Sequence, residues 1–89
     1  MRLDKYLKTC RIIKRRTVSK DIISLGHVLL NGRVAKPASN VKVGDVITLY
    51  LGDKKVTIRV LNILNTTKKE DALSLYEIIN EEKIENEES

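Results

Sequence analysis

The sequence predicts a small α+β fold: two N-terminal helices pack on a small, mainly antiparallel sheet, followed by a short helix or strand and an acidic tail. Three observations carry this prediction. Apolar residues recur at helical spacing over the first 25 residues, and they alternate with polar residues over 54–61. Between these segments, an Asn-Gly pair separates two short apolar runs, which is a strong hairpin signal. A chain of 89 residues has room for one small domain.

The first helix is expected from Arg2 to Arg11. Its apolar stripe consists of Leu3, Tyr6, Leu7 and Cys10. These positions fall on one helix face, so we expect them in the core, with Cys10 as a small buried thiol. Asp4 precedes Lys8 by one turn, in the order that favours an ion pair along a helix.

A second helix is expected from about Arg16 to Leu25, capped by Thr17 or a neighbour. Its apolar face is expected to comprise Val18, Ile22 and Leu25. A basic stripe of Arg16 and Lys20 lies roughly opposite, with Ile23 close to it. The helix is therefore predicted to be amphipathic, although imperfectly.

From residue 27 the period changes to that of strands. Gly26 suits the end of the preceding helix, where a positive φ is common. Asn31-Gly32 predicts a tight turn between two short strands, 27–30 and 33–35. Two longer strands are expected at 46–51 and 54–61, joined by a turn at Gly52-Asp53.

The C-terminal third is less regular. The segment from Thr67 to Glu70 has capping-box spacing, which favours a short helix near 71–74. Residues 75–79 are compatible with a continued helix or a last strand, and we favour the strand. Residues 81–89 contain few apolar side chains and are expected to be a disordered acidic tail.

Charge is unevenly distributed along the chain. The net charge is +5, and it divides into +7 over residues 1–20, +3 over 21–59 and −5 over 60–89. A concentrated basic segment favours a polyanionic partner, because each cation that meets a phosphate releases a condensed counterion, although a solvated helix face is the alternative. The expected phosphate contacts are Arg2, Arg11, Lys14, Arg15, Arg16 and Lys20. The remaining lysines, among them Lys36, Lys42, Lys54 and Lys55, receive no role.

Several function classes are disfavoured. One cysteine (Cys10) and one histidine (His27) provide neither a zinc site nor a supported nucleophile–base pair, and the glycines stand singly at turns. We therefore expect the chain to have no enzymatic activity and to bind no cofactor or metal. No apolar run approaches a membrane span, so a soluble, cytoplasmic chain is expected. With three tyrosines as the only aromatic residues, phosphate and shape contacts to structured nucleic acid are favoured over base stacking.

Five landmarks in order resemble a known family. They are Arg2-Leu3-Asp4, Arg16, Gly26-His27-Val28, Asn31-Gly32 and Gly44-Asp45. This pattern resembles the RNA-binding domain named after small-subunit ribosomal protein S-four, also called the alpha-L motif. The resemblance implies an alpha-L fold over 1–64, with an extension at 65–80 packed on it. It also implies RNA contact by the two helices and the adjoining strand.

Within this resemblance, Arg16 matches the family arginine and is the strongest candidate for an RNA contact. Asp4 would orient bases on the same surface, or form a plain helix ion pair. Two residues depart from the pattern: Ser19 stands where alanine is favoured, and Leu25 where a polar residue is usual. Ser19 is small enough to keep the helices packed, whereas Leu25 would either deepen the core or widen an interaction surface.

Nearly the whole chain, including Thr66–Glu70, Tyr76 and the acidic end, resembles the RqcP family of small bacterial ribosome-associated quality control factors. That resemblance implies a monomer that binds rRNA and tRNA on large ribosomal subunits obstructed by peptidyl-tRNA. It also implies work beside an RqcH-type NEMF factor while alanine tails are added. Three alternatives stay open: a heat-shock-type large-subunit recycling factor, a double-stranded-DNA-binding module and an accessory subunit of an RNA-modifying enzyme.

Overall fold

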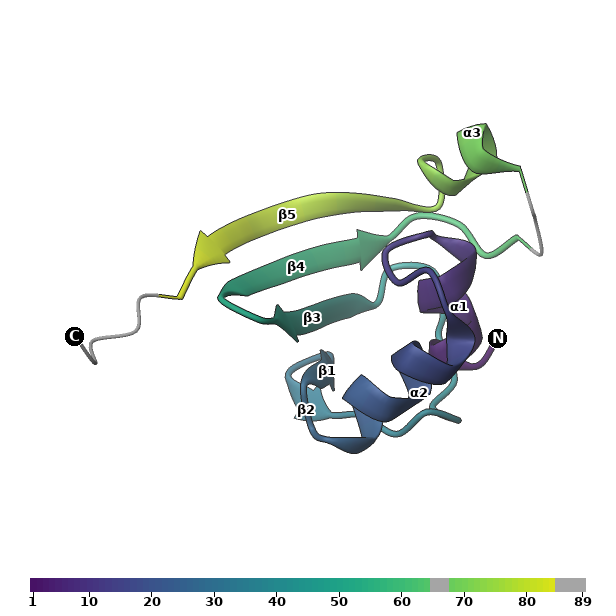
Figure 1. Cartoon of the computed structure of the whole chain (residues 1–89). Coiled ribbons are helices and arrows are strands. Elements are labelled where there is room, and N and C mark those ends of the chain that lie inside the picture. The colour runs from purple at the N-terminus through teal and green to yellow at the C-terminus, as the bar shows by residue number, and fades with distance from the viewer. Residues whose placement is uncertain (65–67, 85–89) are drawn as a thin grey trace.

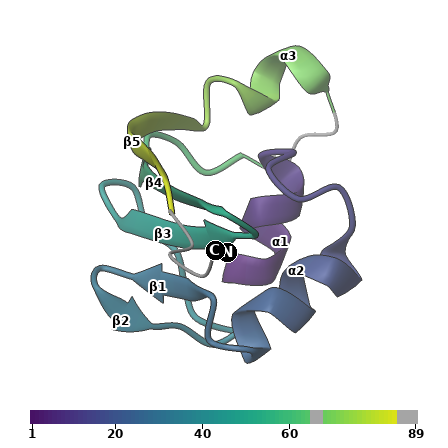
Figure 2. The same cartoon turned by 60° about the vertical axis from the view of Figure 1, so that its left-hand side comes forward.

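Two helices pack against one face of an antiparallel sheet in the computed structural model, which describes residues 1–64 and 68–84 (Figure 1). Helix α1 spans Leu3–Thr9 and helix α2 spans Arg16–Ser24. The sheet consists of β1 (Val28–Leu30), β2 (Arg33–Val34), β3 (Val46–Leu51), β4 (Lys54–Val60) and β5 (Tyr76–Lys83). The strand order is β2-β1-β3-β4-β5, and every neighbouring pair is antiparallel (Figure 2). The predicted α+β class is therefore confirmed.

The core lies between α1 and the middle of the sheet. The predicted stripe of α1 is buried, with Leu3, Tyr6 and Leu7 fully enclosed and Cys10 almost so. From the sheet, the core receives Val28, Ile47, Leu49, Ile58 and Val60. Cross-strand partners such as Ile47 and Ile58 point to the same face of the sheet, so the strand register brings apolar side chains under α1.

The predicted core face of α2 is wrong for Val18 and Leu25, whereas Ile22 packs against the core as expected. Ser19 and Ile23 are the buried residues of this helix, while Val18 and Leu25 are 44% and 69% exposed. Ser19 can enter the core because its hydroxyl donates a hydrogen bond to the main-chain oxygen of Asp4, 3.0 Å away. That bond satisfies a polar group that would otherwise be costly to bury. The small residue at position 19 thus lets α2 approach α1, and Leu25 does not deepen the core.

The β1–β2 turn and the 42–45 turn form one hydrogen-bonded unit. Asn31 and Gly32 have φ values of 52° and 82°, as the predicted tight turn requires. The Asn31 side chain donates to Asp45 Oδ1 (3.1 Å) and accepts from the Val46 N–H (2.9 Å). Asp45 Oδ2 accepts from the Lys42 N–H at 2.8 Å. Asn31 therefore joins the two turns through Asp45 and Val46, which explains why an Asn-Gly pair and a later Gly-Asp pair occur together.

The C-terminal segment joins the same core. Helix α3 covers Lys69–Ala72, two residues before the predicted helix, and the predicted cap Thr67 lies outside the described residues. Leu75 is fully buried in the core. Its main-chain oxygen accepts hydrogen bonds from the Tyr6 hydroxyl (2.6 Å) and the Leu61 N–H (2.8 Å). Residues 76–79 belong to β5, so the favoured strand is the observed one.

The prediction of disorder from residue 81 onward is wrong at its start, because β5 continues to Lys83. Glu81 pairs with Val56, and Glu82 pairs with Lys55. The N–H of Ile84 donates to the main-chain oxygen of Asp53 at 2.6 Å. Antiparallel pairing with β4 satisfies the backbone of this segment, which compensates for its low apolar content. Residues 85–89 lie outside the described part of the chain.

The molecule is elongated, with principal extents of 43 × 22 × 22 Å. Figure 1 shows the paired strands β4 and β5 running away from the helices, with α1 and the N-terminus at one end and the end of β5 at the other. None of the helices in the described residues is long and apolar enough to cross a bilayer.

Candidate nucleic-acid interface

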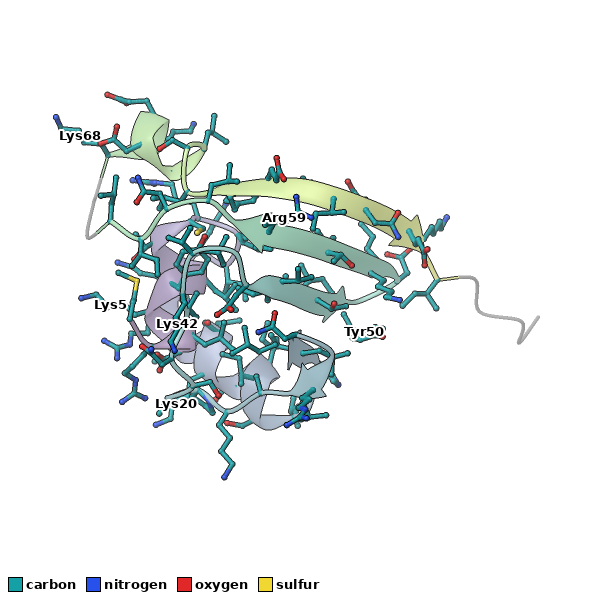
Figure 3. The ribbon with its side chains drawn as sticks, turned by 180° about the vertical axis from the view of Figure 1, so that it is seen from behind. Lys5, Lys20, Lys42, Tyr50, Arg59 and Lys68 are labelled. Atoms are coloured by element: carbon teal, nitrogen blue, oxygen red, sulfur yellow. The ribbon has the colours of Figure 1, made fainter. Side chains whose placement is uncertain are left out.

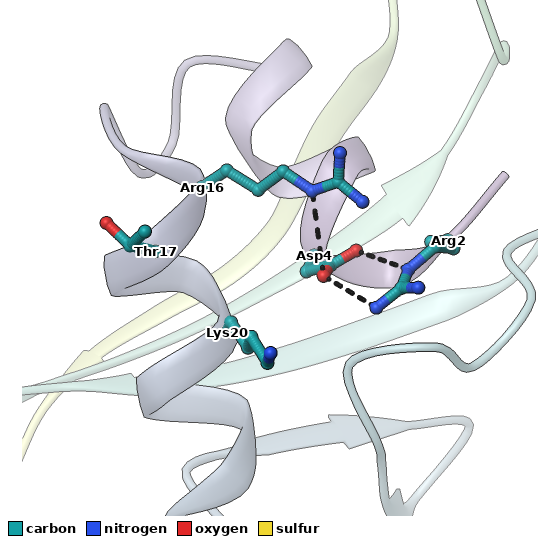
Figure 4. A pocket seen from close by; sticks show the side chains of 5 residues that line it. All are labelled: Arg2, Asp4, Arg16, Thr17 and Lys20. Carbon is teal, nitrogen blue, oxygen red and sulfur yellow. Dashed lines mark hydrogen bonds and ion pairs between the residues drawn. The ribbon is translucent and has the colours of Figure 1, made fainter.

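A shallow depression between α1 and α2 brings together Arg2, which precedes α1, and the two basic residues of α2. It is lined by Arg2, Asp4, Arg16, Thr17 and Lys20 (Figure 4). Arg2 donates to Asp4 through Nε to Oδ1 and Nη2 to Oδ2, both at 3.1 Å. Arg16 Nε lies 3.7 Å from the same Oδ2. One carboxylate thus holds two guanidinium groups at the mouth of the depression.

Asp4 is buried, whereas both arginines reach solvent. The side chain of Asp4 is 2% exposed, and those of Arg2 and Arg16 are 48% and 49% exposed. In Figure 4, Arg16 approaches Asp4 through Nε, and its two terminal nitrogens lie away from the carboxylate. A guanidinium in this position can still hold a phosphate through two parallel hydrogen bonds. The predicted ion pair of Asp4 with Lys8 is wrong: the partners of Asp4 are Arg2 and Arg16.

The surroundings of Asp4 keep its carboxyl ionised. Burial desolvates the group and by itself raises the pKa of Asp4, but this effect is outweighed. Hydrogen bonds from Arg2 and from the Lys5 N–H, together with the positive charges of Arg2 and Arg16, hold the pKa of Asp4 below its usual value. The carboxylate is therefore charged throughout the physiological range.

Asp4→Asn is expected to lower the free energy of unfolding at pH 7 by about 1–3 kcal/mol, as for lost hydrogen bonds to a charged group. Because the folded pKa is depressed, this difference is fully present above the unfolded aspartate pKa of about 3.9. It shrinks as the pH falls further, through the folded pKa, where the wild-type carboxyl becomes neutral. Urea titrations between pH 7 and pH 3 measure the difference, and a gap that stays constant over that range would contradict the prediction.

The loop at 36–41 positions the start of α1. The N-cap residue Arg2 makes no side-chain capping bond. Instead, the N–H of Leu3 donates to the Ser39 main-chain oxygen (2.8 Å), and the N–H of Asp4 donates to that of Pro37 (3.2 Å). These bonds satisfy donors that a helix N-terminus leaves unpaired. The loop therefore caps the helix, and the Asp4 side chain is left to hold the arginines.

The structure separates the predicted RNA-binding residues into two groups. Arg2, Asp4, Arg16 and Lys20 come together in the depression. The other three predicted residues, Arg11, Lys14 and Arg15, lie on the connection between α1 and α2, outside the residues that line it. Arg11 adopts a φ of 61° as the chain leaves α1. The connection therefore carries its own exposed charges beside the helix pair.

Sequence reasoning missed Thr17 as a lining residue. The expected cap of α2 was Thr17 or a neighbour; the N-cap is Arg15, which makes no side-chain capping bond. Thr17 is exposed on the first turn and faces the depression with Arg16 and Lys20. Its separation of three residues from Lys20 places the two on one helix face, and this spacing could have identified Thr17.

Reactive groups of the described residues are buried or isolated. Cys10 is 2% exposed, and burial raises the pKa of its thiol to about 11, so the thiol is protonated at neutral pH. Burial also raises the pKa of Tyr6, whose hydroxyl donates a hydrogen bond to the main-chain oxygen of Leu75. Within residues 1–64 and 68–84, no group of three or more His, Cys, Asp or Glu side chains is arranged to hold a metal ion.

Comparison with known proteins relates this chain to RNA-binding factors. The family model of the S4 domain matches residues 1–47. The RQC P-site tRNA stabilizing factor of Streptococcus pneumoniae is 48% identical over 85 residues, which cover 96% of this chain and 97% of that protein. Its Bacillus subtilis counterpart is 49% identical over 84 residues, covering 94% and 98%. Heat shock protein 15 of Vibrio cholerae superposes with a TM-score of 0.82 at 34% identity, covering 88% of this chain and 80% of that one.

Proposed function

The chain belongs to the S4-domain family that includes the RQC P-site tRNA stabilizing factors, and from this premise we propose that it is a non-enzymatic RNA-binding factor of ribosome-associated quality control. The observation that carries the proposal is the Asp4-anchored pair of arginines between α1 and α2. The depression presents three cations around one carboxylate, and all four residues lie in the part of the chain that the family match covers. Such a surface suits the phosphates of a structured RNA.

The proposed binding mechanism depends on holding the cationic side chains in place before RNA binds. Asp4 fixes Arg2 and Arg16 before RNA arrives, so less side-chain entropy is lost on binding. The terminal N–H groups of Arg16 donate two parallel hydrogen bonds to a phosphate, and Arg2 and Lys20 add positive charge on either side. Arg11, Lys14 and Arg15 extend the contact along the connection between the helices. Asp4 acts on RNA by orienting the arginines.

The finer role follows from the relatives. Two proteins whose names describe stabilisation of a P-site tRNA match this chain over almost its whole length. We infer that the chain binds rRNA and tRNA on large ribosomal subunits obstructed by peptidyl-tRNA, in the cytoplasm. It holds the tRNA in place while an RqcH-type NEMF factor on the same particle adds alanine tails to the stalled chain.

The test compares two preparations of large ribosomal subunits, one carrying peptidyl-tRNA and one vacant. The protein is expected to co-sediment more strongly with the obstructed subunits. Adding it to obstructed subunits with an RqcH-type factor and alanyl-tRNA is expected to lengthen the alanine tails seen on gels. Equal binding to both preparations, with unchanged tails, would contradict the quality-control role.

A heat-shock-type recycling factor is the second candidate, favoured by the superposition on heat shock protein 15. The same experiment separates the two. Preferential binding to obstructed subunits without any effect on alanine tails would favour recycling. Binding with longer tails would favour the tRNA-stabilising role.

A further inference from the structure

The loop that caps α1 also pairs with the chain segment that carries Arg2. Arg2 and Asn40 form an antiparallel bridge. The N–H of Val41 donates to the main-chain oxygen of Met1 at 2.9 Å. Residues 39–41 thus run beside residues 1–3 as a short extended pair. The position of Arg2 at the depression is therefore linked to the position of this loop.

Alternation along the pair decides which side chains face solvent. Leu3 and Val41 are buried, whereas Arg2, Asn40 and Lys42 are exposed. Bridge partners share a face in an antiparallel pair, and residues two apart along an extended chain share it as well. Lys42 follows Asn40 by two residues, which is about 7 Å of extended chain. Lys42 therefore emerges on the same side as Arg2, and one nucleic-acid strand can contact both.

The backbone of Lys42 is fixed, and its side chain is available. Its N–H donates to Asp45 Oδ2 at 2.8 Å, and Asp45 Oδ1 is occupied by Asn31. The Asp45 carboxylate is thus committed to the turn. Among the described residues, the Lys42 ammonium takes part in no ion pair. A positioned, exposed and uncompensated cation beside Arg2 is suited to a phosphate.

Two basic residues of β4, in contrast, are already paired with acidic residues of β5. Arg59 is paired with Glu77 at 2.9 Å, and Lys54 with Glu81 at 3.7 Å. Figure 3 shows Lys5, Lys20 and Lys42 along one flank of the molecule, with Arg59 and Tyr50 over the strands.

Resting on the RNA-binding function proposed above, we propose that Lys42 is a further phosphate-binding residue that extends the interface from Arg16 across Arg2 to the loop.

Lys42→Ala tests this extension in the full chain, with purified large ribosomal subunits as the probe and co-sedimentation measured over a series of KCl concentrations. Loss of one phosphate contact is expected to lower the slope of log affinity against log salt by about 0.7–0.9. The affinity is expected to fall about threefold to tenfold. The thermal midpoint is expected to be unchanged, because the replaced side chain is exposed.

Two other variants make the result decisive. Lys83→Ala removes the same charge from the exposed end of β5, and it is expected to leave the slope unchanged. Arg16→Ala reports on the helix pair itself. If Arg16→Ala weakens binding while Lys42→Ala behaves like Lys83→Ala, the extension is overturned and the proposed function stands. Equal losses for Lys42→Ala and Lys83→Ala would also overturn it, since they report bulk charge. If Arg16→Ala has no effect either, the interface proposed between the helices fails as well.

Discussion

Arg16→Ala is expected to weaken binding to obstructed large ribosomal subunits by about tenfold to a hundredfold. Hydrogen bonds to a charged partner contribute about 1.5–3 kcal/mol, and each 1.4 kcal/mol is a factor of ten in affinity. Arg16 is half-exposed, and it approaches Asp4 through Nε, so its terminal nitrogens are available to a phosphate. Co-sedimentation at fixed salt measures the loss, and a salt series is expected to show a slope lower by about one.

The structure limits the effect of Arg16→Ala on folding. Its ion pair with Asp4 is 3.7 Å long and partly solvated, so it stabilises the fold by about 1 kcal/mol or less. Arg2 still holds the carboxylate through two hydrogen bonds. Arg16→Lys keeps the charge but loses the planar fork, and an intermediate affinity is expected. Full affinity of Arg16→Ala at matched salt would remove this residue from the interface.

Leu75→Ala is expected to lower the free energy of unfolding by about 2–5 kcal/mol, the range for truncating a buried leucine. Leu75 is fully buried under α1, although it lies far along the chain in the C-terminal extension. Its main-chain oxygen is held by the Tyr6 hydroxyl and the Leu61 N–H, so the segment cannot easily collapse into the space left by the side chain. The damage is therefore expected to spread to α1 and the helix pair.

Leu73→Ala is the matched control, because Leu73 is 74% exposed only two residues away. Its effect is expected to stay within about 0.5 kcal/mol. Urea titration followed by circular dichroism measures both variants, and one transition is expected for the wild type. If Leu75→Ala unfolded like Leu73→Ala, the extension would not be part of the core.

Local patterns predicted most of the fold. The stripe of α1 and the alternation of β4 depend on spacing along the chain, and both packed as expected. The face of α2 depended on a contact between residues far apart in sequence. Ser19 enters the core because the Asp4 main-chain oxygen accepts a hydrogen bond from its hydroxyl, and no apolar pattern shows this. Counting apolar positions therefore identified Ile22 correctly but selected Val18 and Leu25 instead of Ser19 and Ile23.

The same distinction applies to the candidate site. The clustering of basic residues near the N-terminus pointed to Arg2, Arg16 and Lys20, and the fold brings these three together. The partners of Asp4 were not predictable from helix spacing, which favours Lys8 at one turn. The orientation of α2 brings Arg16 within 3.7 Å of Asp4 instead. Sequence reasoning also gave Lys42 no role, because its loop lies beside the start of α1 through the Arg2–Asn40 bridge and main-chain hydrogen bonds between residues far apart in the chain.

The elongated shape gives the uneven charge a physical consequence. The first 20 residues carry +7 and contain α1 and the start of α2, so this positive charge lies away from the centre of the molecule and acts as an electric dipole about that centre. The N-terminus and α1 lie at one end of a 43 Å body, and β5 ends at the other. In the field of a polyanion, a dipole experiences a torque that turns its positive end forward, which raises the fraction of productive collisions. At physiological salt the Debye length is about 8 Å. This orienting effect therefore acts during the final approach to the polyanion and not during the long-range search.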